Sequence, residues 1–211
     1  MSTLQLSDDE LRRRLQTRLT TTTAKRGDYD LNPAWRASVA AGRALRPAAV
    51  LVPIIERAAG LRALFTRRAD HLAAHAGQVS FPGGRADAGD ADAVATALRE
   101  TEEEVGLSRD FVSIAGVLDP YETGTGFSIT PIVGFVREGF ELKADASEVA
   151  EIFEVPLRFL MDPTNHERQM RVWQGRERHF YAMTFDGHYI WGATAGMVIN
   201  LYERLHGAAV S

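Results

Sequence analysis

Residues 99–107 read Arg-Glu-Thr-Glu-Glu-Glu-Val-Gly-Leu, which predicts the end of a helix with carboxylates gathered on one face. Residues three and four positions apart share a helix face, so Glu100, Glu103 and Glu104 converge while Glu102 points elsewhere. Carboxylates in a last turn are unfavourable, because the helix dipole is negative there. A solvated acidic face is the simpler interpretation, but a divalent cation would reverse the penalty, since hard cations bind carboxylate oxygens. The pattern favours a metal site.

A glycine-rich segment lies directly upstream, where residues 81–84 read Phe-Pro-Gly-Gly. Paired glycines let a backbone carbonyl approach a metal or a phosphate without a side-chain clash. A loop over residues 85–89 leads into the helix, expected at residues 91–105 with Asp90 as N-cap and Gly106 as its stop. Mg²⁺ usually takes one or two protein carboxylates and its other ligands from water and substrate. The segment therefore predicts Mg²⁺ bound to diphosphate oxygens.

Composition narrows the class of protein. The chain has 211 residues, 24 Lys plus Arg, 28 Asp plus Glu, a net charge of −4 and no cysteine. This length favours one domain, and the lack of Cys excludes a thiol nucleophile, a thiolate zinc site and a disulfide scaffold. The net charge argues against general binding to nucleic acid or an anionic membrane. The longest apolar stretch, residues 48–55, is far shorter than the ~20 residues of a membrane span, so we expect a cytoplasmic protein.

The order of hydrophobic patterns predicts an α+β fold. Ser7 and Glu10 form a capping-box pattern that opens a helix through about Leu19, which residues 20–23, four threonines, then break. We interpret residues 1–45 as an N-terminal helical extension and linker, and residues 46–207 as one domain. Expected elements of that domain are strands at 48–55, 62–66, 111–118, 127–136 and 149–155, a hairpin at 168–174 and 180–185, and a closing helix at 193–205.

These motifs resemble those of the Nudix hydrolases, whose box reads Gly-x5-Glu-x7-Arg-Glu-U-x-Glu-Glu-x-Gly-U, with U aliphatic. Residues 99–107 match its second half, except that Thr101 takes an aliphatic position. The first half departs, because Asp90 stands for the Glu and eight residues separate it from Arg99. The resemblance implies a Nudix-type α/β/α sandwich with a mixed sheet. It also implies attack of water on a phosphorus of a nucleoside diphosphate derivative.

The resemblance further implies a set of metal ligands. Glu100 and Glu104 would be the principal ligands of Mg²⁺, with Mn²⁺ as an alternative. Glu103 would complete the cluster or hold an additional metal, and the Gly84 carbonyl is a further candidate. Arg99 would orient the Glu100 carboxylate.

The general base stays open between carboxylates. Glu100 can serve, but several Nudix enzymes use a carboxylate on a later loop, and Glu148 or Glu151 is placed for that. We prefer Glu148, which precedes a valine as in the subgroup described next, and the catalytic set is then Glu100, Glu103, Arg99 and Glu148.

A second motif narrows the resemblance to coenzyme A pyrophosphatases. Residues 64–84 are similar to their signature Leu-Leu-Thr-x-Arg-[Ser/Ala]-x3-Arg-x3-Gly-x3-Phe-Pro-Gly-Gly, with Phe65 for a Leu and Ala73 for the second Arg. Guanidinium groups bind phosphate oxygens bidentately. The expected substrate-binding residues are Arg67, on a variable position of the signature, Arg68, on a defined one, and Gly83 and Gly84.

The resemblance implies Mg²⁺-dependent hydrolysis of coenzyme A or acyl-CoA to 3′,5′-ADP and 4′-phosphopantetheine or its acyl form. A Nudix pyrophosphatase acting on ADP-ribose or NADH is the first alternative, and a non-catalytic nucleotide-binding domain is the second. The expected partner is a small nucleotide substrate, with no nucleic acid and no membrane; a homodimer is left open. His71 and His75 have the spacing of a zinc pair, but we favour a structural or substrate-contact role.

Overall fold

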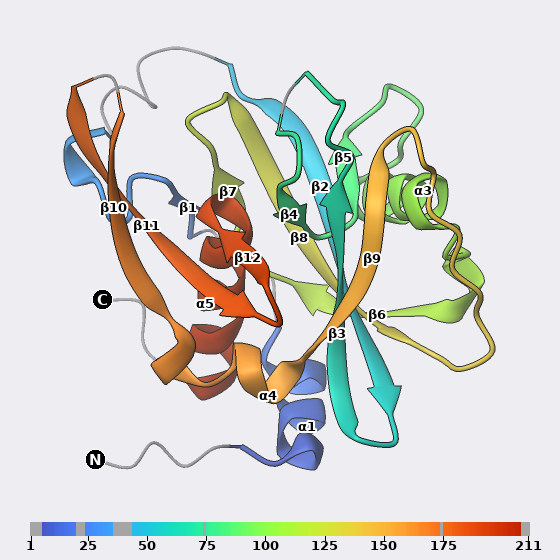
Figure 1. Ribbon diagram of the computed structural model, residues 1–211. Helices are drawn as coiled ribbons and strands as arrows, with labels where there is room; N and C mark the ends of the chain where they lie inside the picture. The colour runs from blue at the N-terminus through green and yellow to red at the C-terminus, as the bar shows by residue number, and fades with distance from the viewer. Residues whose placement is uncertain (1–5, 20–23, 36–43, 74, 174, 208–211) are drawn as a thin grey trace.

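The computed structural model describes residues 6–19, 24–35, 44–73, 75–173 and 175–207. Helices and strands are interspersed along the chain (Figure 1). The helices are α1 (Asp8–Arg18), α3 (Ala93–Val105), α4 (Leu157–Leu160) and α5 (Gly192–His206), with short 3-10 turns at Pro33–Trp35, Arg109–Phe111 and Pro163–Asn165. The strands are β1 (Arg26–Gly27), β2 (Arg46–Arg57), β3 (Gly60–Arg68), β4 (Val79–Ser80), β5 (Gly83–Arg85), β6 (Val112–Val117), β7 (Tyr121–Glu122), β8 (Phe127–Val136), β9 (Val149–Pro156), β10 (Glu167–Trp173), β11 (Arg176–Phe185) and β12 (His188–Trp191).

Strand β2 lies at the centre of a mixed sheet. It pairs in parallel with β8, from Arg46 opposite Phe127 to Ile55 opposite Val136, and antiparallel with β3 and β5. Strand β3 in turn pairs with β4 and β9. The residues of β2 from Ala49 to Ile55 are buried without alternation, as expected for a strand covered on both faces.

Helices cover both faces of this sheet, with α3 on one side and α5 on the other (Figure 1). Under α3 lies a cluster of apolar side chains that includes Leu51, Leu64, Ala97 and Val105. A larger cluster, which includes Phe65, joins the opposite face to α1 and α5. The expected α/β/α arrangement with a mixed sheet is confirmed. None of the helices in the described ranges is long and apolar enough to cross a membrane.

Helix α1 is built into the main core. The Ser7 hydroxyl accepts from the Glu10 amide and caps the helix, as expected, and Leu11 and Leu15 are fully buried in the cluster that holds Phe65. The expected break at residues 20–23 lies outside the described residues. The domain boundary at residue 45 stays a prediction, but α1 shares its core with the residues beyond that boundary.

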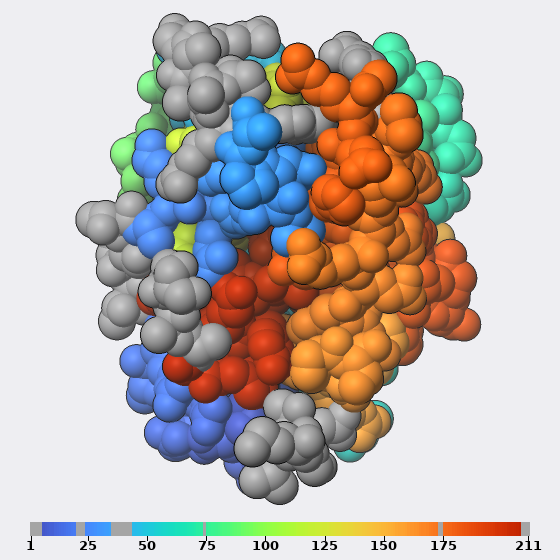
Figure 2. Space-filling model, turned by 90° about the vertical axis from the view of Figure 1, so that its left-hand side faces the viewer, coloured from blue at the N-terminus to red at the C-terminus, as the bar shows by residue number. Residues whose placement is uncertain are grey.

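A second sheet, β10–β11–β12, stands beside the first. The expected hairpin is present as β10 and β11, although Gln174 lies outside the described residues, and β12 extends it. Figure 2 shows β10 (orange) running over this face with residues 24–35 (light blue) beside it. Asn32 joins residues 24–35 to the neighbouring strand β11 by hydrogen bonds to the backbone N–H and C=O of His179.

The start of α3 corrects one prediction. We expected the helix from residue 91 with Asp90 as N-cap, but it begins at Ala93, and Asp92 accepts from the Ala95 amide at 2.8 Å. Both aspartates are competent caps, so the sequence did not distinguish them. Asp90 accepts instead from the side chains of Thr96 and Arg99.

Candidate active site

Packing fixes the rotation of α3 about its axis. Its Ala97 and Val105 side chains are fully buried against the sheet. Thr101, which departs from the aliphatic pattern, is buried on the same face and donates its hydroxyl to the Ala97 carbonyl at 2.6 Å. This bond satisfies the one polar group that the substitution introduces. Thr101 therefore leaves the orientation of α3 unchanged, and Glu104 is directed toward β5.

Glu104 is a buried carboxylate, only 6% exposed. It accepts a hydrogen bond from the Gly83 amide at 3.1 Å, and Arg68 Nη1 lies 4.0 Å from its other oxygen. Burial raises the pKa of Glu104 to about 7, and the charges of Glu148 and Glu100 raise it further against the opposing effect of Gly83 and Arg68. A cation beside this carboxylate would stabilise its ionised form.

Glu100 lies one turn earlier, directly against Gly84. A Cβ placed on Gly84 would be 2.6 Å from the Glu100 carboxyl carbon, so only glycine leaves room for this approach. Burial raises the pKa of Glu100, while the hydrogen bond from Arg99 lowers it. The glycine segment and the carboxylate helix therefore meet at Gly84, and the role of the Gly84 carbonyl as a metal ligand stays a prediction.

Arg99 organises the polar side of the helix. Its Nε and Nη2 donate to the two carboxylate oxygens of Asp90 at 2.9 Å, and its Nη1 donates to Glu100 and Glu103, each also at 2.9 Å. The Arg99 hydrogen bonds hold the pKa of Asp90 far below its usual range. Sequence analysis missed this role of Asp90, whose signal was an acidic residue in place of the family's Glu.

The three expected metal-binding carboxylates are not equivalent. Glu103 is 60% exposed and turns to Arg99. Within the described residues no three His, Asp or Glu side chains are arranged to hold one metal ion, and Arg99 binds both Glu100 and Glu103. Glu100, Glu104 and the Gly84 backbone nevertheless offer the oxygen donors that Mg²⁺ prefers. The buried Glu104, whose ionised form a cation would stabilise, fits such a site, and the ligand assignment stays a prediction.

Of the two later carboxylates, only Glu148 faces the helix. Its charge acts on the pKa of both Glu100 and Glu104. It is exposed, and it follows a segment hydrogen-bonded to the end of α3, where Asp145 N donates to the Glu104 carbonyl at 2.9 Å. Glu151 instead contacts His188 at 3.1 Å. The geometry is consistent with the preference for Glu148 as base, which also stays a prediction.

The two neighbouring arginines of β3 lie on opposite faces of the sheet. Arg68 is directed to Glu104, and its Nε is buried without a hydrogen-bond partner among the described residues. Arg67 forms ion pairs with Asp70 at 2.8 Å and with Glu151 at 3.5 Å. Arg68 is thus at the carboxylate site, whereas two carboxylates already neutralise Arg67.

His71 and His75 lie in turns, not on a shared helix face. His75 has a left-handed backbone (φ 60°) and its Nδ1 lies 2.9 Å from the Gln78 amide oxygen. The left-handed backbone and the contact with Gln78 agree with a structural role for His75 in the loop that precedes β4.

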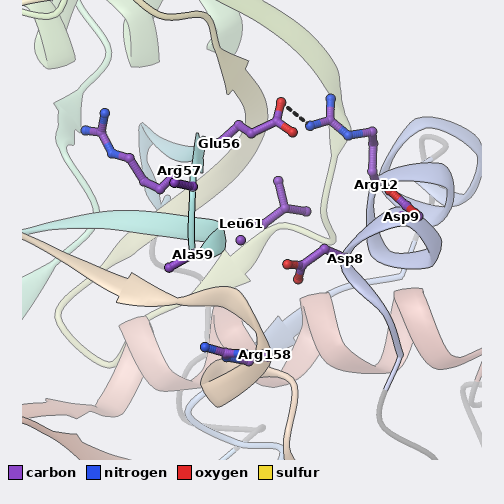
Figure 3. Close-up of a pocket in the computed structure, with 10 residues that line it drawn as sticks. Asp8, Asp9, Arg12, Glu56, Arg57, Ala59, Leu61 and Arg158 are labelled. Atoms are coloured by element: carbon purple, nitrogen blue, oxygen red, sulfur yellow. Dashed lines mark ion pairs between the residues drawn. The ribbon is translucent and has the colours of Figure 1, made fainter.

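A separate groove of about 570 Å³ opens at the other end of β3, between α1 and the β2–β3 turn (Figure 3). Arg12 reaches across it to form an ion pair with Glu56. Gly60 and Leu61 at the start of β3 line it, whereas Arg68 at the end of the strand faces the carboxylates. The groove is therefore distinct from the carboxylate site.

Comparison with known protein families shows to which family the chain belongs. The NUDIX domain matches residues 45–178, which hold the carboxylate helix, the glycine segment and both arginines. The chain belongs to the Nudix hydrolase family. As a Nudix hydrolase it acts on a diphosphate bond of a nucleotide-type small molecule, and members of this family typically use a divalent metal.

Relatives of this Nudix hydrolase are similar over most of their length. It is 40% identical over 160 residues to an uncharacterized Nudix hydrolase NudL from Yersinia pestis (strain Pestoides F), which covers 76% of this chain and 80% of the relative. Among solved structures, the Nudix hydrolase RenU from M. smegmatis is 19% identical, with a TM-score of 0.47 over 54% of this chain and 72% of that one. The MutT protein from Methanosarcina mazei Go1 is 23% identical, with a TM-score of 0.45 over 57% and 83%.

Proposed function

We propose that this Nudix hydrolase cleaves the diphosphate bond of coenzyme A or acyl-CoA, giving 3′,5′-ADP and 4′-phosphopantetheine or its acyl form. One observation carries the proposal: the segment that resembles the coenzyme A pyrophosphatase signature, residues 64–84, contacts the carboxylate helix α3. Gly83, from the end of that segment, donates to Glu104 at 3.1 Å, and Arg68, from its beginning, lies 4.0 Å from the same carboxylate. The subgroup motif and the Nudix box are therefore adjacent at Glu104, which supports the proposal.

The residues divide the work of phosphoryl transfer, which depends on positioning and charge neutralisation. Glu100, Glu104 and the Gly84 carbonyl would hold Mg²⁺ or Mn²⁺, which neutralises diphosphate charge and lowers the pKa of a coordinated water. Arg68 supplies a positive charge beside Glu104, where a diphosphate oxygen would bind.

Arg99 acts on the same site through Glu100. Its bidentate contact with Asp90 fixes the guanidinium, which in turn orients the Glu100 carboxylate. Glu148 is our choice for accepting the proton of the attacking water, because its charge acts on the pKa of both Glu100 and Glu104 and its side chain is open to solvent.

The test is product identification with purified protein in Mg²⁺ or Mn²⁺ and in EDTA. We expect CoA to give 3′,5′-ADP and 4′-phosphopantetheine only when metal is present, with ADP-ribose and NADH cleaved more slowly. Cleavage of ADP-ribose or NADH with CoA untouched would contradict the proposal and favour the first alternative. Nucleotide binding without any hydrolysis would favour the non-catalytic alternative.

A further inference from the structure

A cavity of about 380 Å³ lies between the β3–β4 loop and the second sheet. Its walls are basic, amide and aromatic side chains, with glycines at both loops; the main ones are Arg67, Gln78, Arg171, His188, Tyr189 and Trp191. This volume falls in the range of small-molecule sites. The cavity lies on the face of β3 that carries Arg67, opposite the face that carries Arg68, and the mechanism above does not use it.

Arg171 is the arginine of this cavity that no carboxylate of the described residues neutralises. Its guanidinium carbon lies 5.5 Å from the Trp191 ring centroid and 5.7 Å from that of Phe180. No carboxylate of the described residues forms an ion pair with it, whereas Arg67 has two. Aromatic rings orient a guanidinium without neutralising it. Arg171 is therefore set to receive an anion from a ligand.

The aromatic walls provide flat surfaces beside that cation. The rings of Tyr189 and Trp191 are stacked with centroids 6.3 Å apart, and His188 stacks on Phe153 at 3.7 Å. Tyr189 lies close enough to Arg171 for that arginine to act on its pKa. Flat aromatic rings beside an arginine suit a nucleobase carrying a phosphate.

The chain itself links this cavity to the carboxylate site. Val79 lines the cavity, and Gly83, four residues later, binds Glu104. Four residues span at most about 14 Å. Thr194 at the start of α5 donates to the Val79 carbonyl at 3.1 Å and fixes β4 against the second sheet. The cavity and the Glu104 carboxylate therefore lie at the two ends of one short segment of chain.

We propose that this cavity binds the base and the additional phosphate of the substrate's nucleotide, with Arg171 holding that phosphate. The assignment rests on the proposed function for the identity of the nucleotide, a 3′-phosphorylated adenosine. It makes the second sheet the element that separates phosphorylated from unphosphorylated dinucleotide substrates. Arg171 replaces Arg67 as the principal phosphate contact on this face.

The test compares wild type with Arg171→Ala and Arg171→Lys, using CoA and 3′-dephospho-CoA as substrates. We expect Arg171→Ala to raise KM for CoA about 10- to 100-fold, the loss typical of one charged hydrogen bond. The KM for 3′-dephospho-CoA and both kcat values should stay within about twofold, and Arg171→Lys should recover part of the loss. Arg168→Ala is the matched control, because Arg168 lies on the same strand and does not line the cavity.

Calorimetry in EDTA gives a readout independent of turnover, with 3′,5′-ADP and 5′-AMP as probes. We expect Arg171→Ala to weaken binding of 3′,5′-ADP and to leave that of 5′-AMP unchanged. Equal affinity of wild type and Arg171→Ala for 3′,5′-ADP would overturn the inference even if CoA is cleaved. Arg171-dependent binding of 3′,5′-ADP in a protein that leaves CoA intact would support the cavity and overturn the proposed function.

Discussion

Helices α1 and α3 both carry three consecutive acidic residues, but at opposite ends. In α1 they occupy the first turn, at residues 8–10, and Arg18 stands in the last turn. In α3 they occupy the end of the helix, at residues 102–104, with no basic residue in the last turn. The α1 arrangement agrees with the helix dipole and the α3 arrangement opposes it.

The difference extends to the protonation of the two clusters. Hydrogen bonds from Arg13 and Arg14 lower the pKa of Glu10 to about 2, whereas burial raises the pKa of Glu104 to about 7. Within α1, Arg13 and Arg14 satisfy the Glu10 carboxylate. In α3, Glu102 and Glu103 pair with arginines, and the buried Glu104 is the carboxylate that a further cation would stabilise.

The substitution Glu104→Gln is the strongest test of the difference between the acidic residues of α1 and those of α3. We expect kcat to fall about 10³-fold, because metal stabilisation of transition-state charge is worth several kcal/mol and each 1.36 kcal/mol is tenfold in rate. Steady-state kinetics measures the loss. Glu102→Gln is the matched control on the same helix, since Glu102 is directed to Arg109, and it should keep wild-type kcat.

Glu10→Gln extends that control to α1 and should also leave kcat unchanged. If Glu104→Gln turned over substrate at the wild-type rate, the metal assignment and the contrast between the helices would both fail.

The substitution Leu15→Ala is the converse test on α1. Leu15 is fully buried in the main core, so its truncation should lower the free energy of unfolding by about 2–5 kcal/mol. Urea denaturation followed by circular dichroism measures this change, and kcat under folding conditions should be retained. An unchanged unfolding midpoint would show that α1 does not share the core.

The smallest expected effect comes from Gly84→Ala, which moves a ligand rather than removing it. The added methyl would displace the Glu100 carboxylate, and misplacement by about 1 Å can reduce the rate about 100-fold. Gly89→Ala, in the loop that follows β5, is the control, because its Cβ would meet nothing within 4 Å. Equal losses in the two variants would mean that loop stiffness, not contact with Glu100, sets the rate.

The sequence was most informative where the contacts are local. The spacing of residues 99–107 predicted that Glu100 and Glu104 lie on one side of the helix, and both meet the Phe-Pro-Gly-Gly segment, Glu104 at Gly83 and Glu100 at Gly84. Both follow from one helix and one loop. The exact start of α3 was wrong by two residues, because Asp90 and Asp92 are equally good caps on sequence grounds and only the long-range demand of Arg99 separates them.

Long-range contacts could not be predicted in this way. The partners of Arg67 and Arg68 come from distant parts of the chain, because Glu151 lies on β9, which pairs with β3, and Glu104 lies on α3. The availability of Arg171 depends on Trp191 and Phe180, which reach it only through pairing of the second sheet. Neither is encoded in a motif.

The attachment of residues 143–148 to α3 has a dynamic consequence. Lys143 N donates to the Val105 carbonyl and Asp145 N donates to that of Glu104, each at 2.9 Å, so these bonds cap the end of the helix. Glu148 N in turn donates to the Asp145 carbonyl at 2.9 Å, so the backbone that carries Glu148 is tied to the end of α3. Local opening of this region should be cooperative: the amides of Lys143 and Asp145 would exchange hydrogen together with the last turn of α3, as a single unit.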